Sequence, residues 1–110
     1  LSFLVVQDTH LTATARLAHV VLPSTNFAEK QGTYTNRKGR VQRLQAALVP
    51  PDGALQDWQI FSRLGTKAGD SASYSNPGEI FQAISGEIRR YRGLSYLEIG
   101  EQGVQPGEER

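Results

Sequence analysis

Short apolar runs and a segment of small residues alternate at the start of the chain. Residues 1–6, LSFLVV, are apolar on both faces, which predicts a buried strand of the kind found in parallel sheets. Thr12 begins TATARLAH, for which we predict a helix of about two turns with Thr12 as its N-cap. Residues 19–22 predict a second strand that Pro23 closes. Strand, helix and strand together predict an α/β unit.

The pattern then changes, because residues 24–45 are mostly polar and lack periodicity. Residues 33–35 and 41–44 predict a hairpin around glycine and asparagine turn-formers. Two helices are expected next, one ended by Gly69 and one begun by Asn76 as cap with Pro77 as first helical residue. Their spacing predicts two buried stripes: Leu55, Trp58, Phe61, Leu64 and Ala68 in the first, and Ile80, Phe81, Ile84 and Ile88 in the second. Residues 93–105 carry no clear helix or strand pattern.

Composition narrows the classes of protein. The 110 residues include 12 basic and 11 acidic side chains and no cysteine. This balance argues against a dedicated nucleic-acid binder, and the chain itself supplies no thiolate ligand for a metal or an iron–sulfur cluster. No apolar run approaches the roughly 20 residues that a membrane span needs. The chain starts inside an apolar run without methionine, so we expect it to be part of a longer protein.

Three charged residues are candidates for ligand binding. Asp8 follows the first strand, where α/β sheets bind ligands, and its carboxylate can accept two parallel hydrogen bonds from a guanine; the alternative is that Asp8 caps the turn to Thr12. Lys30 suits a phosphate as a point charge, but is otherwise a solvated lysine. Asp57 is by default an acid at a helix N-terminus. We find no catalytic triad and no metal-ligand spacing.

The hairpin carries a cluster of basic side chains without an acid among them: Arg37, Lys38, Arg40 and Arg43. Such a cluster is usually a solvated face. The sharper alternative is a contact with a polyanion or with a partner subunit.

The order of motifs along residues 5–58 resembles a known family. A strand ending in QD is followed by T-x-T-A, A-x-V-V-L-P, E-K-x-G-T-x-x-N-x-x-G-R-V-Q and then D-W opening a helix. This order is similar to the C-terminal portion of the molybdopterin oxidoreductases, which include formate dehydrogenases, periplasmic nitrate reductases and the large iron–sulfur subunit of NADH:quinone oxidoreductase (complex I). The later YRGLSY and GEQGVQ resemble the segment that follows in formate dehydrogenases.

The resemblance implies a fold and a set of cofactor contacts. The expected fold class is α/β, a fragment of a Rossmann-like molybdopterin-binding domain followed by a polar hairpin and two helices. Residues 1–69 would form the C-terminal part of that domain, residues 70–105 a helical extension, and residues 106–110 a flexible tail. The cofactor contacts carried over, to the guanine dinucleotide end of the molybdopterin, are Gln7, Asp8, Lys30 and Asp57. The chain departs from the family where His19 replaces an Asp, and in residues 53–57, where the family tends to place an acid and an arginine.

The resemblance also implies a function. The segment GTYTNRKGRVQRLQ favours the complex I subunit; the alternatives are a formate dehydrogenase catalytic subunit, or a structural scaffold without cofactor. The parent would be an oxidoreductase with iron–sulfur clusters and the active-site metal ligand elsewhere, so this chain alone would not be catalytic. Expected partners are the rest of its own subunit and other subunits of a respiratory or dehydrogenase complex, with neither nucleic acid nor a membrane span. The expected location is the cytoplasm, at the membrane face as part of a peripheral arm.

Overall fold

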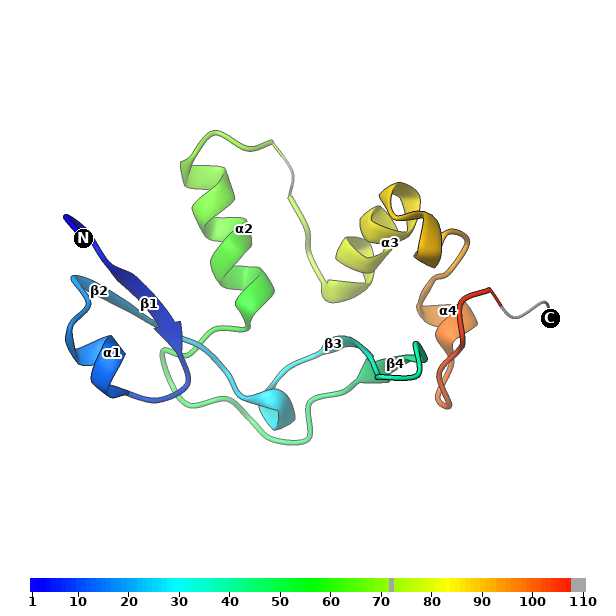
Figure 1. Ribbon diagram of the computed structural model, residues 1–110, viewed down its shortest axis with the longest axis horizontal. Helices are drawn as coiled ribbons and strands as arrows, with labels where there is room; N and C mark the ends of the chain where they lie inside the picture. Colours follow the sequence, from blue (N-terminus) through cyan, green and yellow to red (C-terminus); the bar gives the residue numbers. More distant parts are fainter. Residues whose placement is uncertain (72, 108–110) are drawn as a thin grey trace. The chain divides into compact units, whose positions relative to one another are not determined.

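The computed structural model describes residues 1–71 and 73–107, which form two compact units (Figure 1). The first unit comprises Leu1–Lys30 and Ala46–Ser73, and the second comprises Gln31–Gln45 and Tyr74–Arg110. Both units mix helices and strands, in agreement with the α/β expectation. The division at residues 69 and 105 stays a prediction, and residues 108–110 of the expected tail lie outside the described residues. No described helix combines the length and apolarity that crossing a membrane requires.

A parallel strand pair forms the base of the first unit. Strand β1 (Val5–Asp8) pairs in parallel with β2 (Val20–Pro23), and helix α1 (Ala13–Arg16) connects them. The predicted N-cap is confirmed, because the Thr12 hydroxyl accepts a hydrogen bond from the backbone N–H of Ala15 at 3.2 Å. Helix α1 is a single turn of 4 residues, shorter than predicted.

The parallel pairing of the first strand is confirmed, but its predicted burial is wrong. Phe3 and Val5 keep 61% and 46% of their surface exposed. His19 takes over an anchoring role beside this strand: its Nδ1 accepts the backbone N–H of Leu4 at 3.0 Å, and its ring stacks on Phe3 with centroids 5.3 Å apart. An imidazole thus supplies the hydrogen-bond acceptor that a carboxylate could supply at the same place.

A third extended segment runs beside β2. The backbone N–H of Leu55 donates to Pro23 at 3.2 Å, and that of Thr25 donates to Leu55 at 3.1 Å, which makes a parallel bridge between Ser24 and Leu55. Helix α2 (Asp57–Lys67) follows two residues later, and Gly69, at φ +92°, lies just beyond its end as predicted. The predicted stripe is only partly right: Leu55 and Trp58 are half-buried, but Phe61 and Leu64 are 63% and 50% exposed, and the buried residue of the helix is Ile60, which lies outside the stripe.

An antiparallel hairpin opens the second unit, as predicted. Strand β3 (Gly32–Thr35) pairs with β4 (Val41–Leu44). The turn between them is held by the side-chain oxygen of Asn36, which accepts the backbone N–H groups of Lys38 and Arg40 at 2.9 and 3.1 Å. Gly39 adopts φ +86°, a left-handed conformation that glycine adopts without steric cost.

The helices of the second unit enclose its small core. Helix α3 (Pro77–Glu87) begins as predicted, with Asn76 accepting the backbone N–H of Glu79 at 3.1 Å. The 3₁₀ turn η2 (Arg89–Tyr91) and helix α4 (Tyr96–Ile99) follow. The buried core consists of Val41, Phe81 and Ile99, with Tyr91, Leu94, Tyr96 and Val104 packed against it.

Two points of the sequence prediction need correction in this unit. Ile84 and Ile88 of the expected stripe are 37% and 47% exposed, so Phe81 is the member that enters the core. Helix α4 lies within residues 93–105, where the residue pattern predicted no element and only the resemblance implied a helical extension. The sequence SYLE does contain a helix-start signal, because Ser95 and Glu98 form a capping box. In this box the side chain of each residue accepts the backbone N–H of the other.

Candidate functional site

Three of the four predicted site residues meet in the first unit. Gln7 Nε2 donates to Asp57 Oδ1 at 2.6 Å, and Lys30 Nζ contacts Asp57 Oδ2 at 2.5 Å. The residues are separated by 50 and 27 positions along the chain from Asp57. We call Gln7, Lys30 and Asp57 the carboxylate cluster.

The backbone explains why these side chains meet. Gln7 is the third residue of β1 and pairs with Leu22 of β2. Asp57 is the first residue of α2, two positions after the bridge beside β2, so it lies near the carboxyl end of the parallel strands. Lys30 follows the 3₁₀ turn η1 (Phe27–Glu29), where a capping box between Asn26 and Glu29 fixes the direction of the chain.

The electrostatics of the cluster centre on the Asp57 carboxylate. It lies at the N-terminus of α2, where the helix dipole favours negative charge, and each of its oxygens accepts one donor. The side chains of Lys30 and Asp57 are 22% and 37% exposed, so solvent screens the pair only in part. The cluster therefore offers a carboxylate, an amide and an ammonium group to a polar ligand while keeping a balanced charge.

Asp8 lies next to Gln7 in β1, but its carboxylate makes other contacts. Oδ1 accepts the backbone N–H groups of Thr9 and His10 at 2.7 and 3.3 Å, and Oδ2 contacts the Thr12 hydroxyl at 3.4 Å. This is the turn-capping arrangement considered as the alternative from sequence. The contact at Oδ2 is long, so this oxygen retains capacity to accept a further hydrogen bond. A ligand role for Asp8 stays a prediction.

Two cations of the basic hairpin have structural partners. Arg40 Nη1 donates to the carbonyl oxygen of Gly103 at 3.2 Å, and the Arg43 guanidinium lies 4.7 Å from the centroid of the Tyr96 ring. Burial raises the pKa of the Tyr96 phenol, and the charge of Arg43 lowers it in part. In the sequence these arginines form one cluster with Arg37 and Lys38, because nothing in their spacing distinguishes them.

Metal ligation is a separate possibility for such a site. Within residues 1–71 and 73–107 no group of three or more His, Cys, Asp or Glu side chains gathers as a metal site.

Comparison with known families places this geometry in context. The family model described as "Molybdopterin oxidoreductase" matches residues 1–67, which contain the whole carboxylate cluster and Asp8. This chain belongs to the molybdopterin oxidoreductase family. The resemblance stated from the sequence is therefore confirmed, and with it the assignment of the chain to an oxidoreductase family that uses a molybdopterin cofactor.

Individual molybdopterin oxidoreductases extend the match beyond residue 67. The F420-dependent formate dehydrogenase 2 subunit alpha of Methanococcus maripaludis is 45% identical over 107 residues, covering 96% of this chain and 16% of the relative. The F420-dependent formate dehydrogenase subunit alpha of Methanocaldococcus jannaschii is 45% identical over 106 residues, covering 94% and 16%. The chain thus spans about one-sixth of the length of these relatives.

These names bear on the choice between subunits. Both relatives are named formate dehydrogenases, as is a second enzyme of M. maripaludis that is 38% identical over 106 residues, covering 94% of this chain and 16% of the relative. The expectation of a complex I subunit finds no support among them, whereas the alternative reading does. The resemblance of GTYTNRKGRVQRLQ to complex I came from a segment that these formate dehydrogenases also align with.

Proposed function

We propose that this chain is part of the catalytic alpha subunit of a formate dehydrogenase and forms the guanine dinucleotide end of its molybdopterin site. The reaction proposed for the whole enzyme is the oxidation of formate to carbon dioxide, which releases two electrons and one proton. The observation that carries the proposal is the convergence of Gln7, Lys30 and Asp57 at the carboxyl end of β1 and the N-terminus of α2. Ligands of α/β proteins bind at such strand ends.

The donors and acceptors of the cluster fit a guanine dinucleotide. A carboxylate accepts the N1–H and 2-amino groups of guanine in parallel through its two oxygens, a role that Asp57 could take, whereas Asp8 offers its Oδ2 for a single further hydrogen bond. The Gln7 amide can donate and accept at a base edge, and the Lys30 ammonium suits a phosphate. When bound, the molybdopterin supplies the two-electron redox chemistry through its metal. The residues of this chain bind and orient its nucleotide end.

The contacts among Gln7, Lys30 and Asp57 would hold the binding site in place before the ligand arrives. Without a ligand, Asp57 holds both Lys30 and Gln7, so neither the carboxylate nor the ammonium is left without a partner. A binding site whose side chains are already held loses less conformational entropy when the ligand arrives.

The wider context follows from the same proposal. The parallel pair β1 and β2 with the bridge at Leu55 would be one edge of a Rossmann-like domain completed by the rest of the subunit. Residues 1–69 would belong to that domain and residues 70–105 to a helical extension. Other parts of the enzyme would hold the iron–sulfur clusters, the ligand of the active-site metal and the site for the electron acceptor. The whole enzyme would lie in the cytoplasm.

The test is made on the full-length enzyme. Molybdenum and tungsten are measured by elemental analysis, and guanine nucleotide is assayed after acid release from the same sample. In the Lys30→Met and Asp57→Asn variants we expect metal and nucleotide to fall together by about tenfold or more, since losing a hydrogen bond to a charged group costs about 1.5–3 kcal/mol. Asp8→Ala tests the remaining predicted contact in the same way.

Matched controls keep the result specific. Lys67→Met and Asp52→Asn remove the same charges elsewhere in the first unit and should leave both contents unchanged. Circular dichroism separates loss of cofactor from loss of fold. A wild-type enzyme with neither metal nor guanine nucleotide would overturn the proposal and favour the structural scaffold instead.

A further inference from the structure

Basic side chains from two distant segments meet in the second unit. Arg37 and Lys38 lie in the turn of the hairpin, and Arg90 lies in η2. A Cβ atom built on Gly39 would lie 2.3 Å from Arg90 Nη2, so this guanidinium rests against the hairpin turn. The side chain of Gln105 ties a third segment to the same place, because its Nε2 donates to the Lys38 carbonyl oxygen at 2.6 Å. We call Arg37, Lys38, Arg90 and Arg92 the basic patch.

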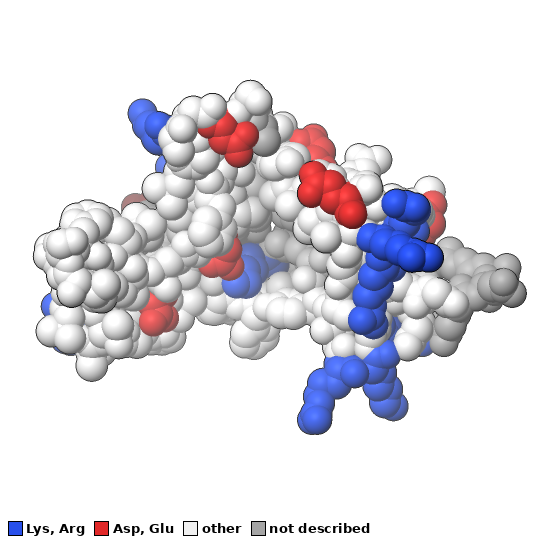
Figure 2. Space-filling view, turned by 45° about the horizontal axis from the view of Figure 1, so that its top comes forward, with Lys and Arg blue, Asp and Glu red and all other residues white. Residues whose placement is uncertain are grey.

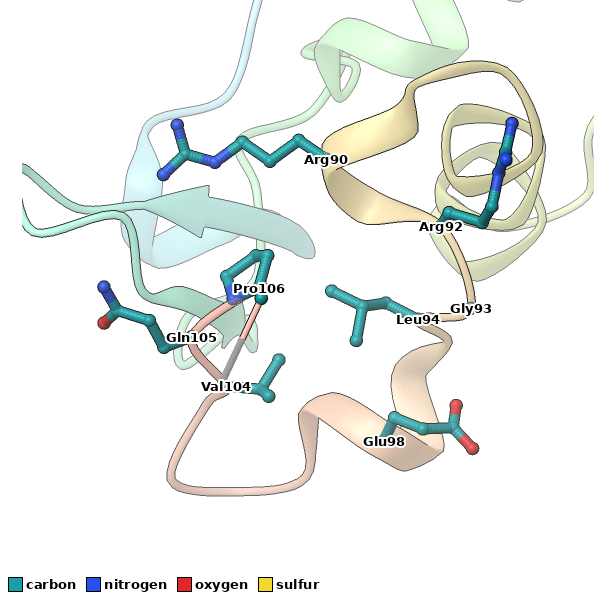
Figure 3. A pocket seen from close by; sticks show the side chains of 9 residues that line it. Arg90, Arg92, Gly93, Leu94, Glu98, Val104, Gln105 and Pro106 are labelled. Atoms are coloured by element: carbon teal, nitrogen blue, oxygen red, sulfur yellow. The ribbon is translucent and has the colours of Figure 1, made fainter. Parts of the chain in front are cut away.

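A hollow of about 290 Å³ lies beside the basic patch (Figure 3). Its lining includes the apolar side chains of Leu94, Val104 and Pro106, together with Arg90 and Arg92. Figure 3 shows the two arginine side chains extending away from each other rather than toward one point. Two guanidinium groups that diverge cannot grip one small anion between them.

The four cations of the basic patch form no ion pair with another described residue. Within residues 1–71 and 73–107, no carboxylate oxygen is recorded within 4.0 Å of a side-chain nitrogen of the four cations. Glu98 also lines the hollow, but its carboxylate accepts the backbone N–H of Ser95 at 2.9 Å in the cap of α4. Figure 2 shows lysine and arginine side chains gathered together over the second unit.

Gathering like charges costs free energy unless an opposite charge compensates them. We propose that the basic patch and the adjoining hollow dock an acidic segment of a partner subunit. Carboxylates of that segment pair with Arg37, Lys38 and Arg92, and an aliphatic side chain between them enters the hollow lined by Leu94 and Val104. Charge complementarity selects this occupant: the spread of the cations suits an extended chain, and the near-balanced charge of the whole sequence, 12 basic to 11 acidic, disfavours a nucleic acid.

The first experiment cross-links the purified multi-subunit enzyme with a zero-length carbodiimide and identifies the products by mass spectrometry. Lys38 Nζ should couple to an aspartate or glutamate of a partner subunit. Coupling of Lys38 only to its own subunit would show that the rest of that subunit covers the patch, and would overturn the proposal. An enzyme that purifies without any partner subunit, or a Lys38 that does not couple, would overturn it as well.

The second experiment reverses charges. In one variant Arg37, Lys38 and Arg92 become Glu, and in a milder variant they become Gln; Arg90 is kept because it packs against Gly39. The dissociation constant of the partner subunit, measured by light scattering or interferometry with purified proteins, should rise by about tenfold or more for the Glu variant. The rise should be smaller for the Gln variant, and the wild-type affinity should fall with added salt.

The matched control reverses three cations of the first unit, with Arg16, Arg63 and Lys67 changed to Glu. This variant has the same net charge change and should keep the wild-type dissociation constant. Equal loss of affinity in the control would mean that overall charge, not the basic patch, governs association. Displacement by inorganic phosphate alone would indicate a small-anion site instead. Metal and guanine nucleotide contents should not change in any of these variants, so the outcome is independent of the cofactor proposal.

Discussion

Replacing Asp57 by Asn tests whether the carboxylate cluster is held by charge. Asn keeps the size of the side chain and an oxygen that accepts from Gln7, but it removes the ion pair with Lys30, whose atoms are 2.5 Å apart. It also removes a negative charge from the N-terminus of α2, an effect of about 0.3–1 kcal/mol. The variant therefore separates electrostatic from steric contributions.

The magnitude follows from the partial exposure of the pair. Fully exposed ion pairs contribute about 0.2–1 kcal/mol, and hydrogen bonds to charged groups about 1.5–3 kcal/mol. With 22% and 37% of the two side chains exposed, we place the ion pair near the border between these ranges, at about 1 kcal/mol. Together with the helix N-terminus, Asp57→Asn should lower the local free energy of opening by about 1–2 kcal/mol, which is roughly a 5- to 30-fold change in the opening equilibrium.

Hydrogen exchange with mass spectrometry measures this effect in the cofactor-free full-length protein. Peptides covering the end of β1 and the first turns of α2 should exchange faster in the variant, whereas Asp52→Asn in the exposed turn should change nothing. A double-mutant cycle with Lys30→Met isolates the pair. If the two substitutions add within about 0.3 kcal/mol, Lys30 and Asp57 do not interact and the reasoning is refuted.

Three further predictions concern other parts of the chain. Gly103 has φ +77°, and a Cβ in Gly103→Ala would lie 2.5 Å from the carbonyl oxygen of Val41 in β4, so hydrogen exchange should show the β4 region destabilised by about 2 kcal/mol. Gly86→Ala is the control, because Gly86 lies in open space within α3, and it should be neutral or stabilising. Equal effects of the two substitutions would contradict the steric argument. His19→Asp should keep an acceptor for the backbone N–H of Leu4, so the hydrogen exchange of this amide should stay slow. His19→Leu removes the acceptor and should speed the exchange of the same amide by about two- to tenfold. No difference between the two variants would refute the role of the Leu4–His19 hydrogen bond. Burial raises the pKa of the Tyr96 phenol above its ordinary 10.0. The stability that the neutral phenol contributes should therefore be intact below pH 10 and be lost as pH rises through the folded-state pKa. The difference in ultraviolet absorbance between the wild type and Tyr96→Phe during a pH titration checks the direction, and ionisation below the ordinary value would disprove it.

Local signals along the chain predicted the elements with dedicated start and stop residues. Thr12 and Asn76 cap helices because their side-chain oxygens reach backbone N–H groups a few residues on, which requires no tertiary partner. Gly69 lies just beyond α2 for an equally local reason, its tolerance of positive φ. The capping box of α4 is an equally local signal. The segment lacks the apolar periodicity from which the other helices were predicted, so no helix was predicted from its residues.

Burial depended on neighbours that no local pattern specifies. The spacing of Phe61, Leu64, Ile84 and Ile88 predicts an apolar face, but whether that face is covered depends on which segment packs against it. In the described residues these side chains keep between 37% and 63% of their surface exposed, while Ile60 is buried. Periodicity therefore identified both helices correctly, but among their predicted buried residues only Phe81 enters a core.

By itself the sequence determined the family, the order of the strands and of the three helices up to residue 87, and the identity of four candidate site residues, because these follow from motifs and from local hydrogen bonding. Only the tertiary structure decided that Gln7, Lys30 and Asp57 meet while the Asp8 carboxylate caps its own turn. It also separated Arg40 and Arg43, which have partners, from the basic patch beside the hollow. The physical reason is the same in both cases: a charge acts through its nearest partners in space, and chain folding brings together partners that lie 27, 50 or 63 positions apart in sequence.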